Sequence, residues 1–111
     1  MRKPYRPVLS VMLLAALLRA GAAVAADPEF FTVFRARPDG YKSIRIPSVV
    51  VTRQGVVLAF AEGRAADADQ AGNSIILKRS RDGGRTWLPL ALIADDGANS
   101  LNNPTAVVEQ E

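Results

Sequence analysis

The chain has 111 residues, with 14 lysines and arginines against 11 aspartates and glutamates, and it contains neither histidine nor cysteine. Without histidine it holds no Ser-His-Asp triad and no zinc-protease motif. Without cysteine it holds no catalytic thiol, no disulfide and no lipidated thiol. Acid–base chemistry within this chain therefore falls to carboxylates, tyrosines, or groups assisted by lysine and arginine.

Residues 1–26 have the layout of a secretory signal peptide. An apolar run over residues 8–18 is followed by small residues, and we predict cleavage after Ala25 or Ala26. The alternative is an uncleaved membrane anchor, but the eleven residues of this run would span only roughly 16 Å as a helix, about half of a hydrocarbon core. We therefore predict export, to a secreted or periplasmic location. The basic residues of this segment are Arg2, Lys3, Arg6 and Arg19.

The charge balance changes once residues 1–26 are set aside. They contain four of the 14 basic residues and none of the 11 acidic ones, so residues 27–111 have 10 basic against 11 acidic residues and a net charge of −1. Because no basic stripe remains, we expect no nucleic-acid partner. With the apolar run removed, we also expect no stable membrane insertion.

The rest of the chain reads as strands separated by turns. Runs rich in β-branched and aromatic residues predict strands over residues 30–34, 44–52, 56–60, 74–79, 87–93 and 105–108. Turn signals occur at residues 38–40 and 54–55, and residues 65–71 are expected to form a loop. No window of helical periodicity interrupts this series. We therefore predict an all-β, antiparallel fold.

The segment over residues 80–87 has the sequence S-x-D-x-G-x-T-W, a pattern suited to a tight hairpin loop. The carboxylate of Asp82 can accept hydrogen bonds from nearby backbone N–H groups. Gly83 and Gly84 can take a positive φ without the strain that a Cβ brings. The fixed positions of the pattern are Ser80, Asp82, Gly84, Thr86 and Trp87.

Three further segments accompany this pattern: Arg45-Ile46-Pro47 before an apolar strand, Glu62-Gly63-Arg64 at the end of the next one, and Asp69 five residues later. In this order and spacing, they resemble the sialidase (neuraminidase) superfamily, in which the 80–87 pattern is the structural Asp-box, or BNR repeat. The position before Arg45, usually aromatic in that family, is Ile44 here. The resemblance implies a six-bladed β-propeller, of which residues 27–111 would be an incomplete N-terminal part covering about the first two blades.

The resemblance also implies roles for individual residues. Arg45 would be one of three arginines that bind the carboxylate of a sialic acid, because a planar guanidinium matches a carboxylate in a bidentate fork. Asp69 would be the general acid and base, with Asp67 as its rival. Arg64 would line the pocket, or else only pair with a neighbouring carboxylate, and Glu62 would orient it. Asn103 would hydrogen-bond the substrate, or else only belong to a turn before a strand.

The function implied by the resemblance is that of an exo-α-sialidase, which hydrolyses terminal α-linked sialic acids of glycoproteins, gangliosides and oligosaccharides. It implies neither a cofactor nor a metal, and the loop starting at Asp67 lacks the ligands of an EF-hand at its fifth and twelfth positions. The implied tyrosine nucleophile, its glutamate partner and two further arginines have no counterpart in this sequence. We therefore expect this chain to be inactive by itself. We also expect it to be poorly soluble, because two blades leave edge strands unpaired and an apolar face uncovered.

Two alternatives come from other classes of protein. One is a non-catalytic Asp-box propeller that binds a glycan or a protein, in which Asp69 would be dispensable. The other is a truncated, inactive gene product. A trans-sialidase would share every site residue named above, so the sequence does not separate transfer from hydrolysis.

Overall fold

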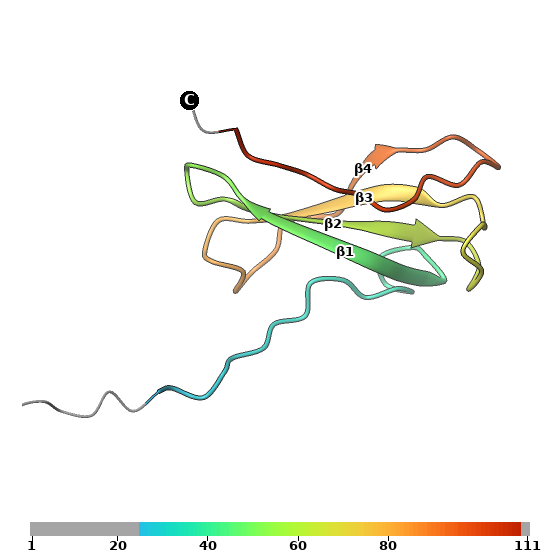
Figure 1. The fold of residues 1–111 in the computed structure, drawn as a ribbon. Helices are drawn as coiled ribbons and strands as arrows, with labels where there is room; N and C mark the ends of the chain where they lie inside the picture. The colour runs from blue at the N-terminus through green and yellow to red at the C-terminus, as the bar shows by residue number, and fades with distance from the viewer. Residues whose placement is uncertain (1–24, 110–111) are drawn as a thin grey trace, which may run out of the picture.

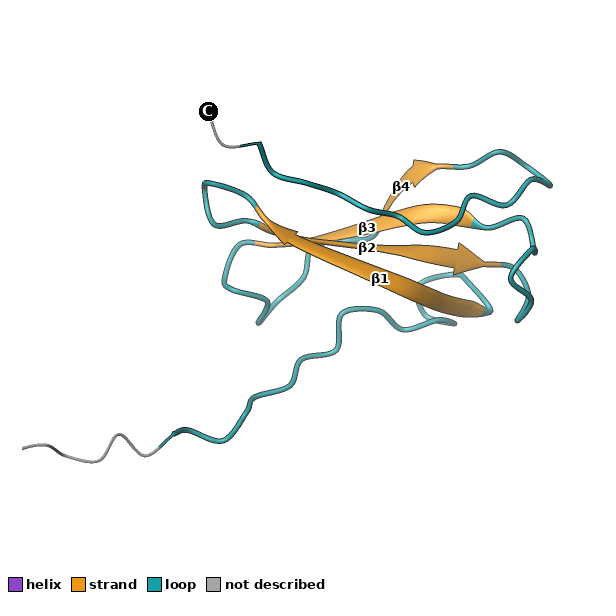
Figure 2. Cartoon of the chain, in the orientation of Figure 1, coloured by secondary structure: helices purple, strands orange, loops and turns teal. Residues whose placement is uncertain are grey.

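A computed structural model describes residues 25–109, which form one four-stranded antiparallel sheet (Figure 1). The strands are β1 (Ser43–Val51), β2 (Val57–Arg64), β3 (Ser74–Ser80) and β4 (Ala91–Ala94). They lie in the order β1-β2-β3-β4, so each strand pairs with its neighbour in the sequence. The described residues contain no helix, as Figure 2 shows, and hence no helix that could cross a membrane. This architecture confirms the all-β, antiparallel prediction for the described part of the chain.

The turn between β1 and β2 follows from its sequence. The N–H of Thr52 donates to the carbonyl of Val56, and the N–H of Gly55 donates to the carbonyl of Thr52, each at 2.9 Å. Gly55 has a φ of 78°, a conformation that residues with a Cβ rarely adopt. The Thr52 hydroxyl also accepts the N–H of Val56 at 3.1 Å. These contacts close the hairpin and set its register.

A β-bulge interrupts the pairing of β1 with β2. Arg45 lies opposite Glu62 and Ser48 lies opposite Phe60, so β1 has one more residue than β2 across this interval. Ile46 sits inside the bulge with a φ of 53°, which is a genuine outlier for a β-branched residue. Bulges of this kind re-aim side chains, often beside functional sites.

The two faces of the sheet differ in character, because successive side chains of a strand point to opposite faces. One face carries Ala59, Ala61 and Ile76, each at most 1% exposed, which form most of the apolar core; the fourth core residue, Leu77, is on the other face. The other face carries Glu62 and Arg64, which are also buried. In Figure 1 the chain before β1 runs along one side of the sheet and residues 100–109 run along the other.

The chain before β1 is tied to the face that carries the apolar core. The ammonium group of Lys78 donates to the carbonyl of Val33 at 3.0 Å and to both carboxylate oxygens of Asp39 at 2.8 Å. Burial by itself would raise the pKa of Asp39, but hydrogen bonds from the Arg35 N–H and from Lys78 outweigh it and lower this pKa overall. The contacts of Lys78 therefore hold the segment before β1 against β3.

Tyr41 packs on the same side, against Gly63. A Cβ placed on Gly63 would lie 2.5 Å from Cε1 of the Tyr41 ring, so the close approach requires glycine at this position. Since Gly63 alternates along β2 with Glu62 and Arg64, Tyr41 lies on the face opposite to these two charged residues.

The 80–87 loop has the hydrogen bonds that its pattern predicts. Asp82 accepts the N–H of Thr86 at 2.9 Å and both hydroxyls, from Ser80 at 2.7 Å and from Thr86 at 2.5 Å. The Ser80 hydroxyl in turn accepts the N–H of Gly84 at 2.8 Å. The indole N–H of Trp87 donates to the Gly84 carbonyl at 3.0 Å. Gly83 and Gly84 both have a positive φ, as expected for a tight loop.

The hydrogen bonds of this loop also set the ionisation of its central carboxylate. Those from the Thr86 hydroxyl, the Thr86 N–H and the Ser80 hydroxyl lower the pKa of Asp82 to about 2. Each of these donors favours the ionised form. The loop is therefore built around a carboxylate that stays charged well into the acid range.

Several predicted strands differ from the observed ones. Residues 30–34 and 105–108 form no strand, because no neighbouring strand in the described part of the chain offers them hydrogen-bond partners; Phe30 and Val107 are each 89% exposed. The strand predicted for residues 87–93 begins only at Ala91, after the 80–87 loop and Leu88. β2 extends four residues further than predicted, to Arg64. The described strands make a single sheet, and the six-bladed propeller and its two-blade coverage stay predictions. The predicted signal peptide lies outside the described residues, apart from its last two positions.

Candidate active site

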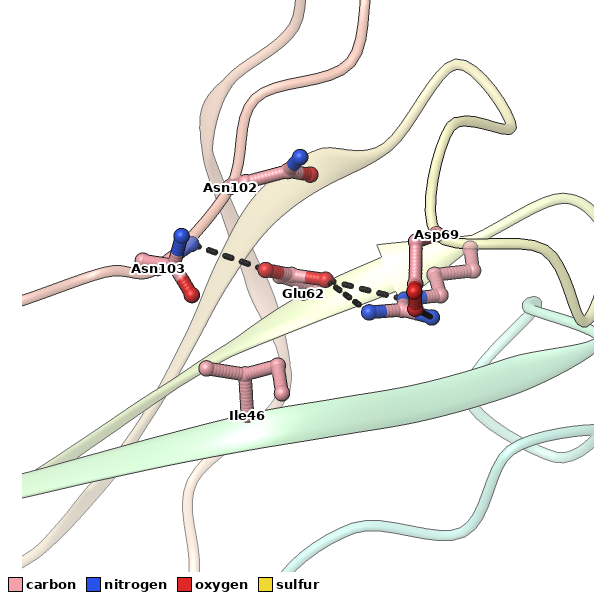
Figure 3. A pocket seen from close by; sticks show the side chains of 6 residues that line it. Ile46, Glu62, Asp69, Asn102 and Asn103 are labelled. Carbon is pink, nitrogen blue, oxygen red and sulfur yellow. Dashed lines mark hydrogen bonds and ion pairs between the residues drawn. The ribbon is translucent and has the colours of Figure 1, made fainter.

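A pocket of about 230 Å³ opens on the charged face of the sheet (Figure 3). Three features of the chain meet there: the bulge of β1, the end of β2 with the loop that follows it, and the segment over residues 100–103. The residues that line the pocket are Ile46, Glu62, Arg64, Asp69, Asn102 and Asn103. Three of the four predicted site residues, Arg64, Asp69 and Asn103, are thus brought together.

Glu62 and Arg64 form a buried ion pair at the base of this pocket. Their side chains are 1% and 2% exposed. Being two residues apart on β2, they point to the same face of the sheet. The guanidinium donates to Glu62 Oε2 from Nε at 2.9 Å and from Nη2 at 2.6 Å. The sequence-based hypothesis that Glu62 orients Arg64 agrees with this contact.

Asp69 completes the charged cluster at the surface. Arg64 Nη1 donates to Asp69 Oδ1 at 2.7 Å and to the carbonyl of Ala68 at 3.4 Å. The Asp69 side chain is 81% exposed, in contrast to that of Arg64. Hydrogen bonds to Asp69 and then to Glu62 raise the pKa of Arg64, so the guanidinium is a permanent cation. The site thus presents a solvent-accessible carboxylate whose position is fixed by a buried positive charge.

The rival acid, Asp67, lies elsewhere. Its carboxylate pairs with Lys42 at 3.3 Å, and both side chains are largely exposed. It does not line the pocket, whereas Asp69 does. The geometry therefore favours Asp69 over Asp67 for any chemistry in this pocket.

Asn103 closes the pocket on the side away from Asp69. Its backbone N–H donates to Glu62 Oε1 at 2.8 Å, so both carboxylate oxygens of Glu62 have partners (Figure 3). Its φ is 54°, a left-handed conformation that asparagine tolerates better than most residues. Asn102 lines the pocket next to it. The contact of Asn103 with substrate and the alternative of a turn before a strand both stay predictions.

Arg45 differs from the other predicted site residues, because it does not line the pocket. It is exposed and lies opposite Glu62 in the pairing of β1 with β2, and cross-strand partners share a face of the sheet. Within residues 25–109 it makes no hydrogen bond or ion pair. It is therefore a free cation beside the pocket, on the same face.

Three residues of this region had no role in the sequence-based prediction, and Asn102, next to Asn103, is one of them. Ile46 lines the pocket from the bulge, and Asn73, fully buried, lies directly before β3. No sequence pattern indicated the role of Ile46 or of Asn73: Asn73 stands in an ordinary polar turn before an apolar strand, and a residue before proline is normally extended. Within the described part of the chain, no cluster of three acidic residues could hold a metal ion.

Comparisons with known proteins agree with the family resemblance, although no protein-family model matches the chain. It is 35% identical over 97 residues to an exo-alpha-sialidase of Aspergillus fumigatus, 34% over 103 residues to a sialidase of Micromonospora viridifaciens, and 35% over 77 residues to an exo-alpha-sialidase of Arthroderma benhamiae. These matches cover 76%, 78% and 63% of this chain, but only 24%, 16% and 19% of the relatives, so the chain spans about a quarter of their length or less. The chain belongs to the sialidase family.

Proposed function

We propose that the full-length gene product is an exo-α-sialidase that releases terminal α-linked sialic acids from glycoconjugates. The observation that carries the proposal is the pocket in which an exposed carboxylate, Asp69, is held by a buried arginine, Arg64. The names of the related proteins support the same activity.

In this proposal Asp69 is the general acid and base. It donates a proton to the glycosidic oxygen as the bond to the anomeric carbon breaks, and it later accepts a proton from the water that attacks that carbon. An exposed carboxylate suits this role, because the same group must meet first the leaving group and then water. Its ion pair with Arg64 fixes the direction in which it faces.

The proposed nucleophile is a tyrosine, as in other sialidases. Tyr41 is the single tyrosine of residues 25–109, and it packs against Gly63 on the other face of the sheet. It therefore does not take this role, and a tyrosine from another part of the full-length protein would be needed. The partner glutamate of that tyrosine and two further arginines are likewise assigned to other parts of the protein.

Arg45 and Asn103 have the remaining roles in this proposal. Arg45 has no partner within the described residues, so its guanidinium is available to a substrate carboxylate, with a charge-assisted hydrogen bond of about 1.5–3 kcal/mol. The Asn103 side chain would hydrogen-bond the sugar, while its backbone holds Glu62. The 80–87 loop, as the family's Asp-box, would have a structural role away from the pocket.

We also propose that the protein acts outside the cytoplasm, after removal of residues 1–26. Sialylated glycoproteins, gangliosides and oligosaccharides on other cells or in the medium are its proposed substrates. Export would place the pocket where such glycans occur.

The test is a sialoside hydrolysis assay on the full-length gene product, with Asp69→Ala and the matched control Asp67→Ala. General acid–base catalysis contributes typically about 10²- to 10⁴-fold to a rate, so we expect a loss of that order in Asp69→Ala. Asp67→Ala should keep the activity of the unsubstituted protein, since Asp67 lies outside the pocket. Unchanged turnover in Asp69→Ala would remove Asp69 from this role, and an inert unsubstituted protein would overturn the proposed activity.

A further inference from the structure

Asn73 connects two sides of the pocket without lining it. It is fully buried, at 0% exposure, and directly precedes β3. Its amide nitrogen donates two hydrogen bonds of 2.7 Å, one to the backbone carbonyl of Asp69 and one to the side-chain oxygen of Asn102. One side chain therefore holds both the loop that carries Asp69 and the segment that closes the pocket opposite it.

Backbone contacts around Asn73 strengthen this connection. The N–H of Leu101 donates to the carbonyl of Asn73 at 2.9 Å. The hydroxyl of Ser100 accepts the N–H groups of Gly72 and Asn73 at 3.0 and 3.4 Å. The residues joined are 27–29 positions apart in the sequence, and the Ser100 contacts attach residues 100–102 to the start of β3, whereas the Asn73 side chain alone also reaches Asp69.

Asp69 is thereby held at two points. Arg64 holds its carboxylate at 2.7 Å, and Asn73 holds its main-chain carbonyl at 2.7 Å. Since its side chain is 81% exposed, packing contributes little to its position. The two hydrogen bonds are the contacts that define where the carboxylate stands.

Asn73 has one acceptor that the described residues do not use. Its side-chain oxygen is buried and has no hydrogen-bond partner within the described residues. A buried acceptor left unpaired is unfavourable, and native proteins contain few of them. Unpaired buried polar atoms of this kind, when they occur, are expected at functional sites. The structural role of the Asn73 amide therefore lies in the two hydrogen bonds that its nitrogen donates, to Asp69 and to Asn102.

We propose that Asn73 is a positioning residue for Asp69: its amide, by holding the Asp69 carbonyl and Asn102 together, aligns the Asp69 carboxylate with the leaving-group oxygen. The proposal rests on the proposed sialidase activity, in which Asp69 is the general acid. A displacement of about 1 Å in such a group can lower a rate by about 10²-fold. Loss of the amide should therefore impair proton donation specifically.

Leaving groups of different basicity test this assignment. Departure of a sugar alkoxide requires protonation, whereas an aryl leaving group departs as a stabilised phenolate. We would measure kcat/KM of the full-length gene product and its Asn73→Ala variant on a sialyl-galactoside and on a nitrophenyl sialoside. For the variant we expect a loss of about 10²-fold on the sialyl-galactoside, but of no more than about threefold on the aryl sialoside.

Two further variants control for a purely structural effect. Ser100→Ala removes the hydrogen bonds to the N–H groups of Gly72 and Asn73, but contacts neither Asp69 nor Asn102. Any loss in it should be equal on both substrates. Asn73→Ser keeps one donor in a smaller side chain and should give an intermediate discrimination between the substrates. It carries the test if Asn73→Ala does not fold.

The outcomes separate the two hypotheses. A selective loss on the sialyl-galactoside in the Asn73 variants supports the positioning role. An equal loss on both substrates in an active protein overturns that role and leaves the proposed activity intact. If the unsubstituted protein hydrolyses neither substrate, the proposed activity fails and the assignment of Asn73 fails with it.

Discussion

Glu62 and Arg64 are joined through a single carboxylate oxygen, Glu62 Oε2, which accepts hydrogen bonds from Nε at 2.9 Å and from Nη2 at 2.6 Å. The other oxygen accepts the N–H of Asn103 at 2.8 Å. Both charged side chains are almost fully buried. Charges are tolerated in such a setting only when they are paired and their hydrogen bonds are satisfied. Each charge of the pair therefore has the partners that its burial requires, and the pair lines the pocket.

The first prediction compares the two carboxylates that pair with Arg64, the buried Glu62 and the exposed Asp69. Glu62→Ala leaves the buried guanidinium without the partner that accepts two of its hydrogen bonds, and breaking a buried pair in this way costs about 3–5 kcal/mol. Asp69→Ala, which removes the exposed partner of the same arginine, should change the stability by at most about 1 kcal/mol. Urea unfolding of the full-length gene product measures both. Equal destabilisation by the two substitutions would contradict the assigned difference in burial.

The second prediction concerns the backbone of Ile46. Glycine adopts a φ near 53° without the clash of a Cβ, whereas alanine does not. Both Ile46→Gly and Ile46→Ala remove the same side chain from the pocket. We therefore expect the glycine variant to be more stable than the alanine variant by about 1 kcal/mol. An alanine variant of equal or greater stability would show that the backbone at this position is not left-handed.

The third prediction concerns the contact of Gly63 with Tyr41. Gly63→Ala places a methyl group 2.5 Å from the present position of the ring, so the ring must shift. We expect a destabilisation of about 1–3 kcal/mol, as for other overpacking substitutions. Combined with Tyr41→Ala, the same substitution should have a much smaller effect, because the two residues are in contact. A double-mutant cycle from thermal unfolding measures this coupling, and additive effects would refute the contact.

The fourth prediction concerns pH. The pKa of Asp82 is about 2 in the folded chain, below its ordinary value of 3.8. Since the unfolded chain binds the proton more readily, this group stabilises the fold above about pH 4, and its contribution is lost as the pH falls towards 2. Asp82→Asn keeps an acceptor but does not titrate. The melting temperatures of the two proteins should therefore converge between pH 4 and pH 2, whereas a constant difference would contradict this account.

The fifth prediction concerns export. Expressed in a secreting host, the protein should be recovered outside the cytoplasm with Ala26 or Asp27 as its first residue, which intact-mass analysis determines. A charge in the apolar run, as in Leu14→Asp, should retain the protein in the cytoplasm, while Leu14→Val should leave export unaffected. An exported protein that still begins at Met1 would exclude cleavage.

The strands best predicted from the sequence are those whose own residues determine them. Residues 44–52 and 74–79 were predicted to within one residue at each end, because β-branched runs there are bounded by turn residues. Residues 30–34 and 105–108 have a similar composition but form no strand. Strand formation depends on a hydrogen-bonding neighbour, and local sequence carries no information on whether one is present.

For the site, contacts within one strand could be predicted from the sequence, whereas contacts between distant segments could not. The contact between Glu62 and Arg64 follows from their spacing on one strand. The links from Asn73 to Asn102 and from Asn103 to Glu62 join residues 29 and 41 positions apart, and only the folded chain brings them together. The left-handed backbone of Ile46 also lay beyond sequence patterns, since an isoleucine before proline is ordinarily extended.

The order of the strands has a consequence for how the pocket is assembled during synthesis. Every strand pairs with the one made just before or after it, so the sheet can grow strand by strand as the ribosome releases the chain. Glu62, Arg64 and Asp69 are available once β3 has emerged. The N–H group of Asn103, on which Glu62 Oε1 depends, follows 41 residues after Glu62. During synthesis there is therefore an interval in which only Oε2 of Glu62 has its hydrogen-bond partner. The pocket closes when the segment that contains Asn103 reaches the sheet.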